Sequence, residues 1–101
     1  MIKNALGVDV KIVKKTLEQS TPNSITQIVA RKGGITRNYY DKEGKLVKQI
    51  SNNDHGHKAE RGFGKHGEHA HDVTFKPDGK MARSKARELT AYERAENEDI
   101  L

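Results

Sequence analysis

The sequence predicts an α+β fold, in which a small antiparallel sheet of two hairpins carries one or two flanking helices. Two stretches, 35–51 and 69–83, alternate apolar and polar residues on either side of a turn, as hairpins do. A third, residues 8–18, spaces its apolar residues as a helix would. The chain has 101 residues, of which 33% are apolar. That length predicts a single domain with one modest core.

The first element lies in VDVKIVKKTLE, residues 8–18. Alternation over Val8–Ile12 is typical of a strand, whereas Val10, Val13 and Leu17 would share one face of a helix. We expect a helix from Val10 to about Gln19, because KKTLEQ is poor strand material. The proline and asparagine of the following STPN end this element.

A strand and a hairpin are expected next. SITQIVA (24–30) is apolar enough on both faces for a partly buried strand, and Lys32-Gly33-Gly34 forms a turn after it. ITRNYYD (35–41) and KLVKQIS (45–51) read as strands joined by a short loop that glycine closes. Tyr39 and Tyr40 are adjacent on the first of them, so at least one ring is expected to pack in the core rather than stack on bases.

The C-terminal half contains a loop, a second hairpin and a helix. Residues 51–68 predict an irregular loop, because Phe63 is nearly their only apolar side chain. HAHDVTF (69–75) and KMAR (80–83) form a hairpin around a Pro-Asp-Gly turn. Thr90 and Glu93 form a capping box that opens a helix reaching about Asn97. We expect no further role for this pair.

The charge balance favours partners that carry phosphate. Nineteen Lys and Arg against fourteen Asp and Glu give a formal net charge of +5. The candidate nucleic-acid-binding residues are Lys76, Lys80, Arg83, Lys85, Arg87 and Arg61. Most of these cations would be equally expected at the solvated edge of a hairpin, where lysine and arginine prevent aggregation. The absence of cysteine excludes disulfides and thiolate metal sites, and the absence of a long apolar run predicts no membrane span.

All five histidines lie between His55 and His71. Histidine can both take and give a proton near neutral pH, so two imidazoles and a cation suffice to cleave RNA without a metal. One ring removes the 2′-OH proton, the other protonates the leaving 5′ oxygen, and the cation stabilises the phosphorane. The candidate catalytic residues are His66, His69, His71, Lys65 and His55.

Two other interpretations of the histidines stay open. We expect no cofactor, but zinc is the alternative, since imidazole is one of its common ligands. His69 and His71 would share one face of a strand, and His66 and His55 could complete the set. The other interpretation is a solvated loop of biased composition with no function.

Three stretches carry a resemblance to a known family. They are GGITRNYYDKEGKLVKQISNNDHG, GKHGEHAHD and RELTAYERAENEDIL. Together they resemble the small C-terminal domain of phage head-morphogenesis proteins and polymorphic toxins of Gram-positive bacteria, over roughly residues 24–101. Residues 1–23 lie outside the resemblance. The chain departs from the family pattern after Gly56, where HKAERGF replaces a proline-containing segment, so the resemblance does not extend to His57 or Arg61.

The resemblance implies a function by analogy, because toxin domains of this type are commonly nucleases. It favours a toxin-type nuclease that cleaves RNA without a metal. The alternative is a non-catalytic prophage module that binds protein or nucleic acid, with structural or zinc-bound histidines. The partners it implies are RNA, an immunity protein or a phage head or portal protein. The expected location is the cytoplasm of a phage-infected or lysogenic bacterium, with delivery from the cell or packaging in a virion as alternatives.

Overall fold

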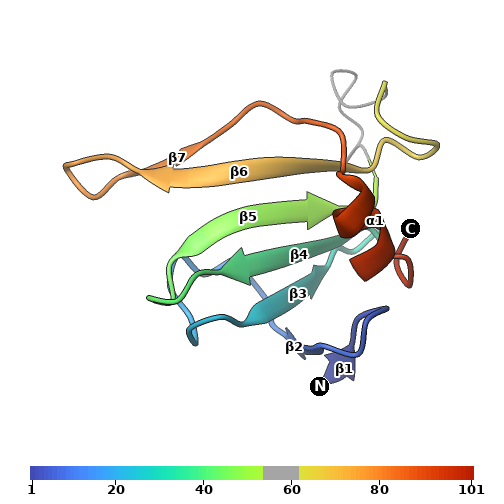
Figure 1. The fold of residues 1–101 in the computed structure, drawn as a ribbon, viewed down its shortest axis with the longest axis horizontal. Helices are drawn as coiled ribbons and strands as arrows, with labels where there is room; N and C mark the ends of the chain where they lie inside the picture. Colours follow the sequence, from blue (N-terminus) through green and yellow to red (C-terminus); the bar gives the residue numbers. More distant parts are fainter. Residues whose placement is uncertain (54–61) are drawn as a thin grey trace.

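The described part of the chain forms one mixed sheet crossed by a single short helix (Figure 1). The structure is a computed structural model that describes residues 1–53 and 62–101. Seven strands lie in the order β1-β2-β3-β4-β5-β6-β7. Their bounds are β1 Ile2–Lys3, β2 Asp9–Ile12, β3 Ile25–Val29, β4 Ile35–Tyr40, β5 Leu46–Ser51, β6 His69–Phe75 and β7 Met81–Arg83. The helix α1 spans Ala91–Glu96.

The expected fold class, α+β with two hairpins, is wrong. The sheet has seven strands, and β2 pairs with β3 in parallel while its other neighbour, β1, is antiparallel. The helix expected from Val10 to Gln19 does not form; β2 and an irregular segment replace it. Val10 is fully buried opposite Ile2, and Leu17 packs on an apolar cluster of the sheet. Pairing on both sides of β2 therefore outweighs the helical spacing.

Three local expectations are confirmed. The strand at 24–30 is β3, and the two expected hairpins are β4–β5 and β6–β7. In the first hairpin turn, the Asp41 carboxylate accepts hydrogen bonds from the backbone N–H groups of Glu43 and Lys45, and Gly44 takes a φ of 80°. The helix begins as expected: Thr90 Oγ1 accepts from Glu93 N, and the Glu93 side chain accepts from Thr90 N. No helix among the described residues is long and apolar enough to cross a bilayer.

The sheet presents two different faces because its side chains alternate. The helix-covered face carries the cluster of Ile50, Ala70 and Leu89, against which the ring of Tyr39 packs. The opposite face, here called the histidine face, has an apolar end and a polar end. Its apolar end is the cluster of Tyr40, Leu46 and Val73, with Leu17 and Phe75 packed against it. Its polar end comprises Thr26, Thr36, Asn38, Gln49, Ser51, His69 and His71. The two tyrosine rings thus pack on opposite faces.

Polar groups of the sheet fix the C-terminal segment to the helix-covered face. Arg37 is fully buried and donates two hydrogen bonds to the Asp99 carboxylate, at 2.9 and 2.6 Å, and one to Asn97 Oδ1 at 3.0 Å. Tyr39 donates its hydroxyl to Glu96 at 2.7 Å. Burial, together with this carboxylate, raises the pKa of Tyr39 well above its ordinary value. Figure 1 accordingly shows α1 lying across the ends of β4 and β5.

Glu93 does more than cap the helix. Its carboxylate lies 2.8 Å from the Arg87 guanidinium and 3.0 Å from Lys48 Nζ, and its side chain is only 5% exposed. Arg87 also donates two hydrogen bonds to Asp72 of β6. Burial alone would raise the pKa of Glu93, but the bonds from Arg87, Thr90 and Lys48 outweigh it and lower the pKa to about 2. Charge therefore links α1 to β5 and β6.

We expect the ionised Glu93 to contribute to stability in a pH-dependent way. Its folded pKa of about 2 lies below the ordinary 4.5, so its contribution is complete above pH 4.5 and is lost as the pH falls towards 2. Glu93→Gln should lower the free energy of unfolding at pH 7 by about 2 kcal/mol and flatten its decline in acid. Urea denaturation between pH 2 and 7 measures both effects.

The matched control is Glu98→Gln, which removes the same charge from an exposed residue close to α1. This variant should stay within about 0.5 kcal/mol of the original chain. If the free energy of unfolding depends on pH in the same way for the Glu93→Gln variant and the original chain, ionisation of this carboxylate is not coupled to folding.

Candidate functional site

His69 and His71 of β6 form a contacting imidazole pair on the histidine face. Their ring centroids lie 4.9 Å apart with the planes at 88°, an edge-to-face arrangement. The pair is largely buried, with His69 1% and His71 8% exposed. Strand alternation brings the two rings together, because residues two apart in a strand share a face. This is the pairing that a strand over 69–75 predicted.

Backbone carbonyls set the tautomer of both rings. His69 Nδ1 lies 2.8 Å from the Gly67 carbonyl oxygen, and His71 Nδ1 lies 2.8 Å from that of Ser84. A carbonyl oxygen can only accept, so Nδ1 carries the proton in each ring and Nε2 is the basic nitrogen. Orientation by a third group is what general acid–base catalysis and metal binding both require of a histidine.

Uncharged polar side chains of β4 and β5 adjoin the imidazole pair. Ser51 lies directly opposite His69 across the β5–β6 pair, and Gln49 lies opposite His71. The Ser51 hydroxyl is 3.0 Å from that of Thr36 on β4. Gln49 and Ser51 are buried, at 7% and 3% exposure. The pair therefore belongs to a polar patch built from three neighbouring strands.

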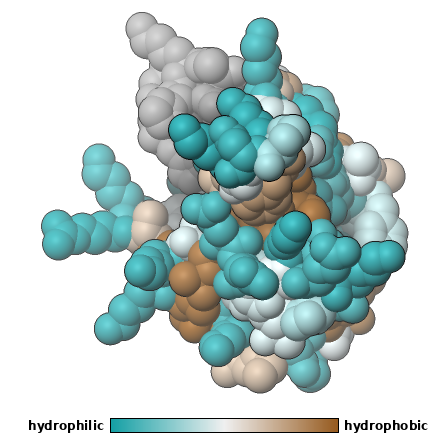
Figure 2. Space-filling view, turned by 90° about the vertical axis from the view of Figure 1, so that its left-hand side faces the viewer, coloured by the Kyte–Doolittle hydropathy of each residue, from teal (hydrophilic) through white to brown (hydrophobic). Residues whose placement is uncertain are grey.

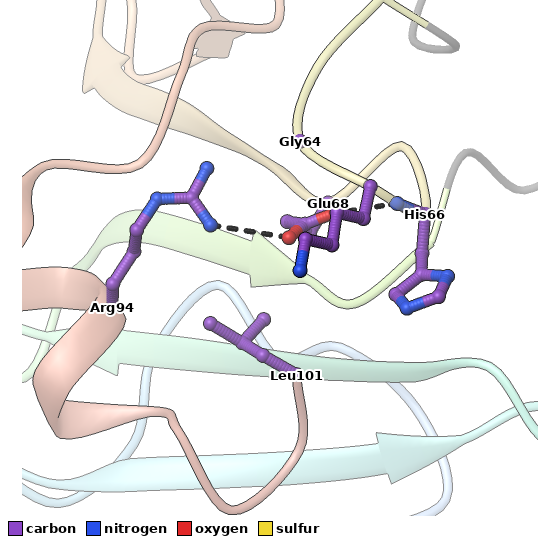
Figure 3. A pocket seen from close by; sticks show the side chains of 6 residues that line it. Gly64, His66, Glu68, Arg94 and Leu101 are labelled. Atoms are coloured by element: carbon purple, nitrogen blue, oxygen red, sulfur yellow. Dashed lines mark hydrogen bonds and ion pairs between the residues drawn. The ribbon is translucent and has the colours of Figure 1, made fainter.

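His66 and Lys65 belong to a different group of side chains. Both are exposed residues of the turn before β6 and line a hollow of about 530 Å³, together with Gly64, Glu68, Arg94 and Leu101. Arg94 comes from α1, so the hollow borders the helix-covered side of the sheet. Figure 3 shows the His66 imidazole directed away from the Glu68–Arg94 ion pair. His66 and Lys65 thus line a hollow to which the imidazole pair does not contribute.

Glu68 organises this turn. Its carboxylate accepts the backbone N–H of His66 at 2.8 Å and a guanidinium N–H of Arg94 at 3.1 Å. Burial would raise the pKa of Glu68, but these bonds outweigh burial and hold the pKa below its ordinary value. Gly64 lies against the carboxylate at a φ of 56°, and a Cβ there would collide with it. The glycine is therefore needed for Glu68 to lie where it does.

The cations of 76–87 differ in their environments. Lys76, Lys80 and Lys85 are exposed residues at the β6–β7 turn and after β7. Arg87 forms ion pairs with both Asp72 and Glu93, which compensate its charge. Figure 2 views the molecule from the end that bears the β6–β7 turn, where hydrophilic side chains project around a smaller hydrophobic area. Arg83 contacts a buried amide instead: its Nη1 donates to Gln49 Oε1 at 3.2 Å.

Two residues of the expected site, His55 and Arg61, fall outside the described part of the chain, as does His57. Within residues 1–53 and 62–101, no group of three or more histidine, aspartate and glutamate side chains is placed to hold a metal ion. Of the expected zinc ligands His55, His66, His69 and His71, the structure brings together His69 and His71.

Sequence analysis overlooked the uncharged members of this site, Asn38, Gln49 and Ser51. A signal for them exists: polar uncharged residues recur at every second position of β4 and β5, as Thr36 and Asn38 and then as Gln49 and Ser51. Such alternation along two neighbouring strands indicates that one face of the sheet is polar. The amides and hydroxyl of Asn38, Gln49 and Ser51 are buried and form hydrogen bonds with neighbouring side chains of the same face.

Comparison with known proteins gives no relative. No protein-family model, no curated protein and no solved structure matches this chain significantly. The function therefore has to be argued from the geometry of the site.

We expect NMR to show the Nδ1–H tautomer for both strand histidines. In long-range ¹H–¹⁵N spectra, the neutral form of each ring, His69 and His71, should carry its proton on Nδ1, because a carbonyl accepts it. Variants His69→Gln and His71→Gln assign the signals. An Nε2–H signal from either ring would contradict the orientation described here.

Gly64→Ala should displace the Glu68 carboxylate and lower the free energy of unfolding by about 1–3 kcal/mol, through steric collision and positive φ. Gly62→Ala is the control, because a Cβ at Gly62 meets nothing within 4 Å. Urea denaturation compares the two variants. Equal stability of both would show that the turn adapts without cost.

Proposed function

We propose that the chain is a ribonuclease-like domain that cleaves RNA by histidine acid–base catalysis without a metal. His69 and His71 are the acid–base pair of this proposal. The observation that supports it is the contact between two imidazoles whose Nδ1–H groups are both held by backbone carbonyls. In each ring Nε2 is then the nitrogen that can exchange a proton.

The cleavage step needs one neutral and one protonated ring. The neutral ring takes the proton of the ribose 2′-OH, and the 2′ oxygen forms a bond to phosphorus. The bond from phosphorus to the 5′ oxygen breaks, and the protonated ring gives its proton to that oxygen. The products are a 2′,3′-cyclic phosphate and a 5′-OH.

The charge and the resemblance support RNA as the substrate. A formal net charge of +5 attracts polyanions, and the toxin-type domains that the sequence resembles are commonly nucleases. On this proposal the domain acts in the cytoplasm of a phage-infected or lysogenic bacterium. An immunity protein would be its inhibitor, and a phage head or portal protein its carrier.

Zinc binding is the second candidate, and the same hydrogen bonds favour it. Metal-ligating histidines typically donate their second ring N–H to a carbonyl or carboxylate, as His69 and His71 do. In this alternative the domain is a non-catalytic prophage module and the histidines are structural. Elemental analysis of the purified protein distinguishes the two, since a stoichiometric zinc content would favour the module.

The decisive experiment is cleavage of labelled RNA in EDTA. We expect cleavage with a bell-shaped pH profile, and a loss of at least about 100-fold in His69→Ala and in His71→Ala. Thr74→Ala, which changes an exposed residue of the same strand, should cleave normally. Melting curves, with His69→Gln and His71→Gln as milder variants, show whether the fold is intact.

Three outcomes would contradict the proposal. They are the absence of cleavage by the folded chain, cleavage that EDTA abolishes, and activity that depends on His66 but survives in both β6 variants.

A further inference from the structure

A chain of hydrogen bonds crosses the histidine face from β3 to β7. Asn38 Nδ2 donates to Thr26 Oγ1 at 3.4 Å, and Gln49 Nε2 donates to Asn38 Oδ1 at 2.8 Å. Arg83 Nη1 then donates to Gln49 Oε1 at 3.2 Å. Thr26, Asn38 and Gln49 are buried, whereas Arg83 is exposed. The chain of bonds therefore runs from the interior to a guanidinium at the surface.

The arginine fixes the direction of every bond in this chain. A guanidinium can only donate, so Gln49 must turn its oxygen towards Arg83 and its nitrogen towards Asn38. Asn38 then presents its oxygen to Gln49 and its nitrogen to Thr26. Each amide has one orientation that satisfies both neighbours. Arg83 is consequently held in place by a neutral and oriented acceptor.

Arg83 differs from the other arginines that contact the sheet or α1 in having no carboxylate partner among the described residues. Arg37 is paired with Asp99, Arg87 with Asp72 and Glu93, and Arg94 with Glu68 and Glu88. An amide oxygen positions a guanidinium but does not cancel its charge. Arg83 therefore keeps a full positive charge and unused donors for an anion.

Arg83 lies beside the imidazole pair. Gln49, its acceptor, is directly opposite His71 across the β5–β6 pair. Arg83 itself is opposite Val73, two residues along β6 and on the same face as His71. The carbonyl that orients His71 belongs to Ser84, the next residue. Arg83 therefore supplies a cation beside His71, and the neighbouring Ser84 orients the His71 ring.

We infer that Arg83, positioned by Gln49, forms an anion-binding subsite next to His71 and takes a phosphate group of the substrate. This inference rests on the proposed function and deepens it, because it names the group that holds the phosphate during cleavage. It assigns to Arg83 the role that the sequence suggested for Lys65, which lines the hollow with Glu68 and Arg94. Gln49 is a positioning residue that acts through Arg83.

Binding of inorganic phosphate tests the subsite without any cleavage. Phosphate is titrated while the ring signals of His71 are followed by NMR. We expect saturable shifts in the original chain and about 10-fold weaker binding in Arg83→Gln. Gln49→Glu should weaken binding to a similar extent, because the isosteric carboxylate would pair with Arg83. Arg31→Gln, the same change at an exposed turn residue, should leave the affinity within about 2-fold.

RNA cleavage by the same variants provides the second measurement. We expect kcat/KM to fall about 100-fold in Arg83→Gln, much less in Arg83→Lys, and little in Arg31→Gln. Equal effects of Arg83→Gln and Arg31→Gln on phosphate binding and on cleavage would overturn the inference while leaving the ribonuclease proposal intact. The opposite result is also informative. If the chain binds phosphate in a way that depends on Arg83 but cleaves no RNA, the anion-binding subsite is supported and the ribonuclease proposal fails.

Discussion

The pairing of β5 with β6 fixes where the candidate catalytic groups lie. It sets Gln49 opposite His71, and it turns Ala70, between the two histidines, to the helix-covered face. There Ala70 packs in an apolar cluster that includes Leu89, close to the start of α1. Since side chains alternate, a shift of one residue would exchange the faces of Ala70 and His69. Apolar packing on one face thus fixes the position of the imidazoles on the other.

The two faces of the sheet differ in how their charged side chains are paired. On the helix-covered face the buried ions Arg37 and Glu93 have partners of opposite charge, Asp99 and Arg87. These pairs hold α1 and the C-terminal segment to the sheet, but they leave little charge for a ligand. The polar end of the histidine face instead contains amides, hydroxyls and imidazoles, with Arg83 at its edge. A site that has to bind phosphate needs such an uncompensated cation.

Short-range signals made part of the fold predictable. The capping box of Thr90 and Glu93 spans four residues and forms as expected, and each hairpin is specified by its own turn. The helix predicted in the N-terminal segment is wrong because the conformation of this segment depends on partners distant in sequence. Val10 pairs with β1, and the residues beside it pair in parallel with β3. The spacing of VDVKIVKKTLE allows a helix or a strand, and no local feature decides between them.

The sequence by itself determined that imidazoles and cations gather in one part of the chain, and that His69 and His71 share a strand face. Only the tertiary structure decided which of them meet. It directs Glu68 and the turn bearing His66 towards α1, and it brings Gln49 and Arg83 to the imidazole pair. The reason is physical: alternation along a strand is a local property, whereas contacts across strands depend on register and on the burial of both faces.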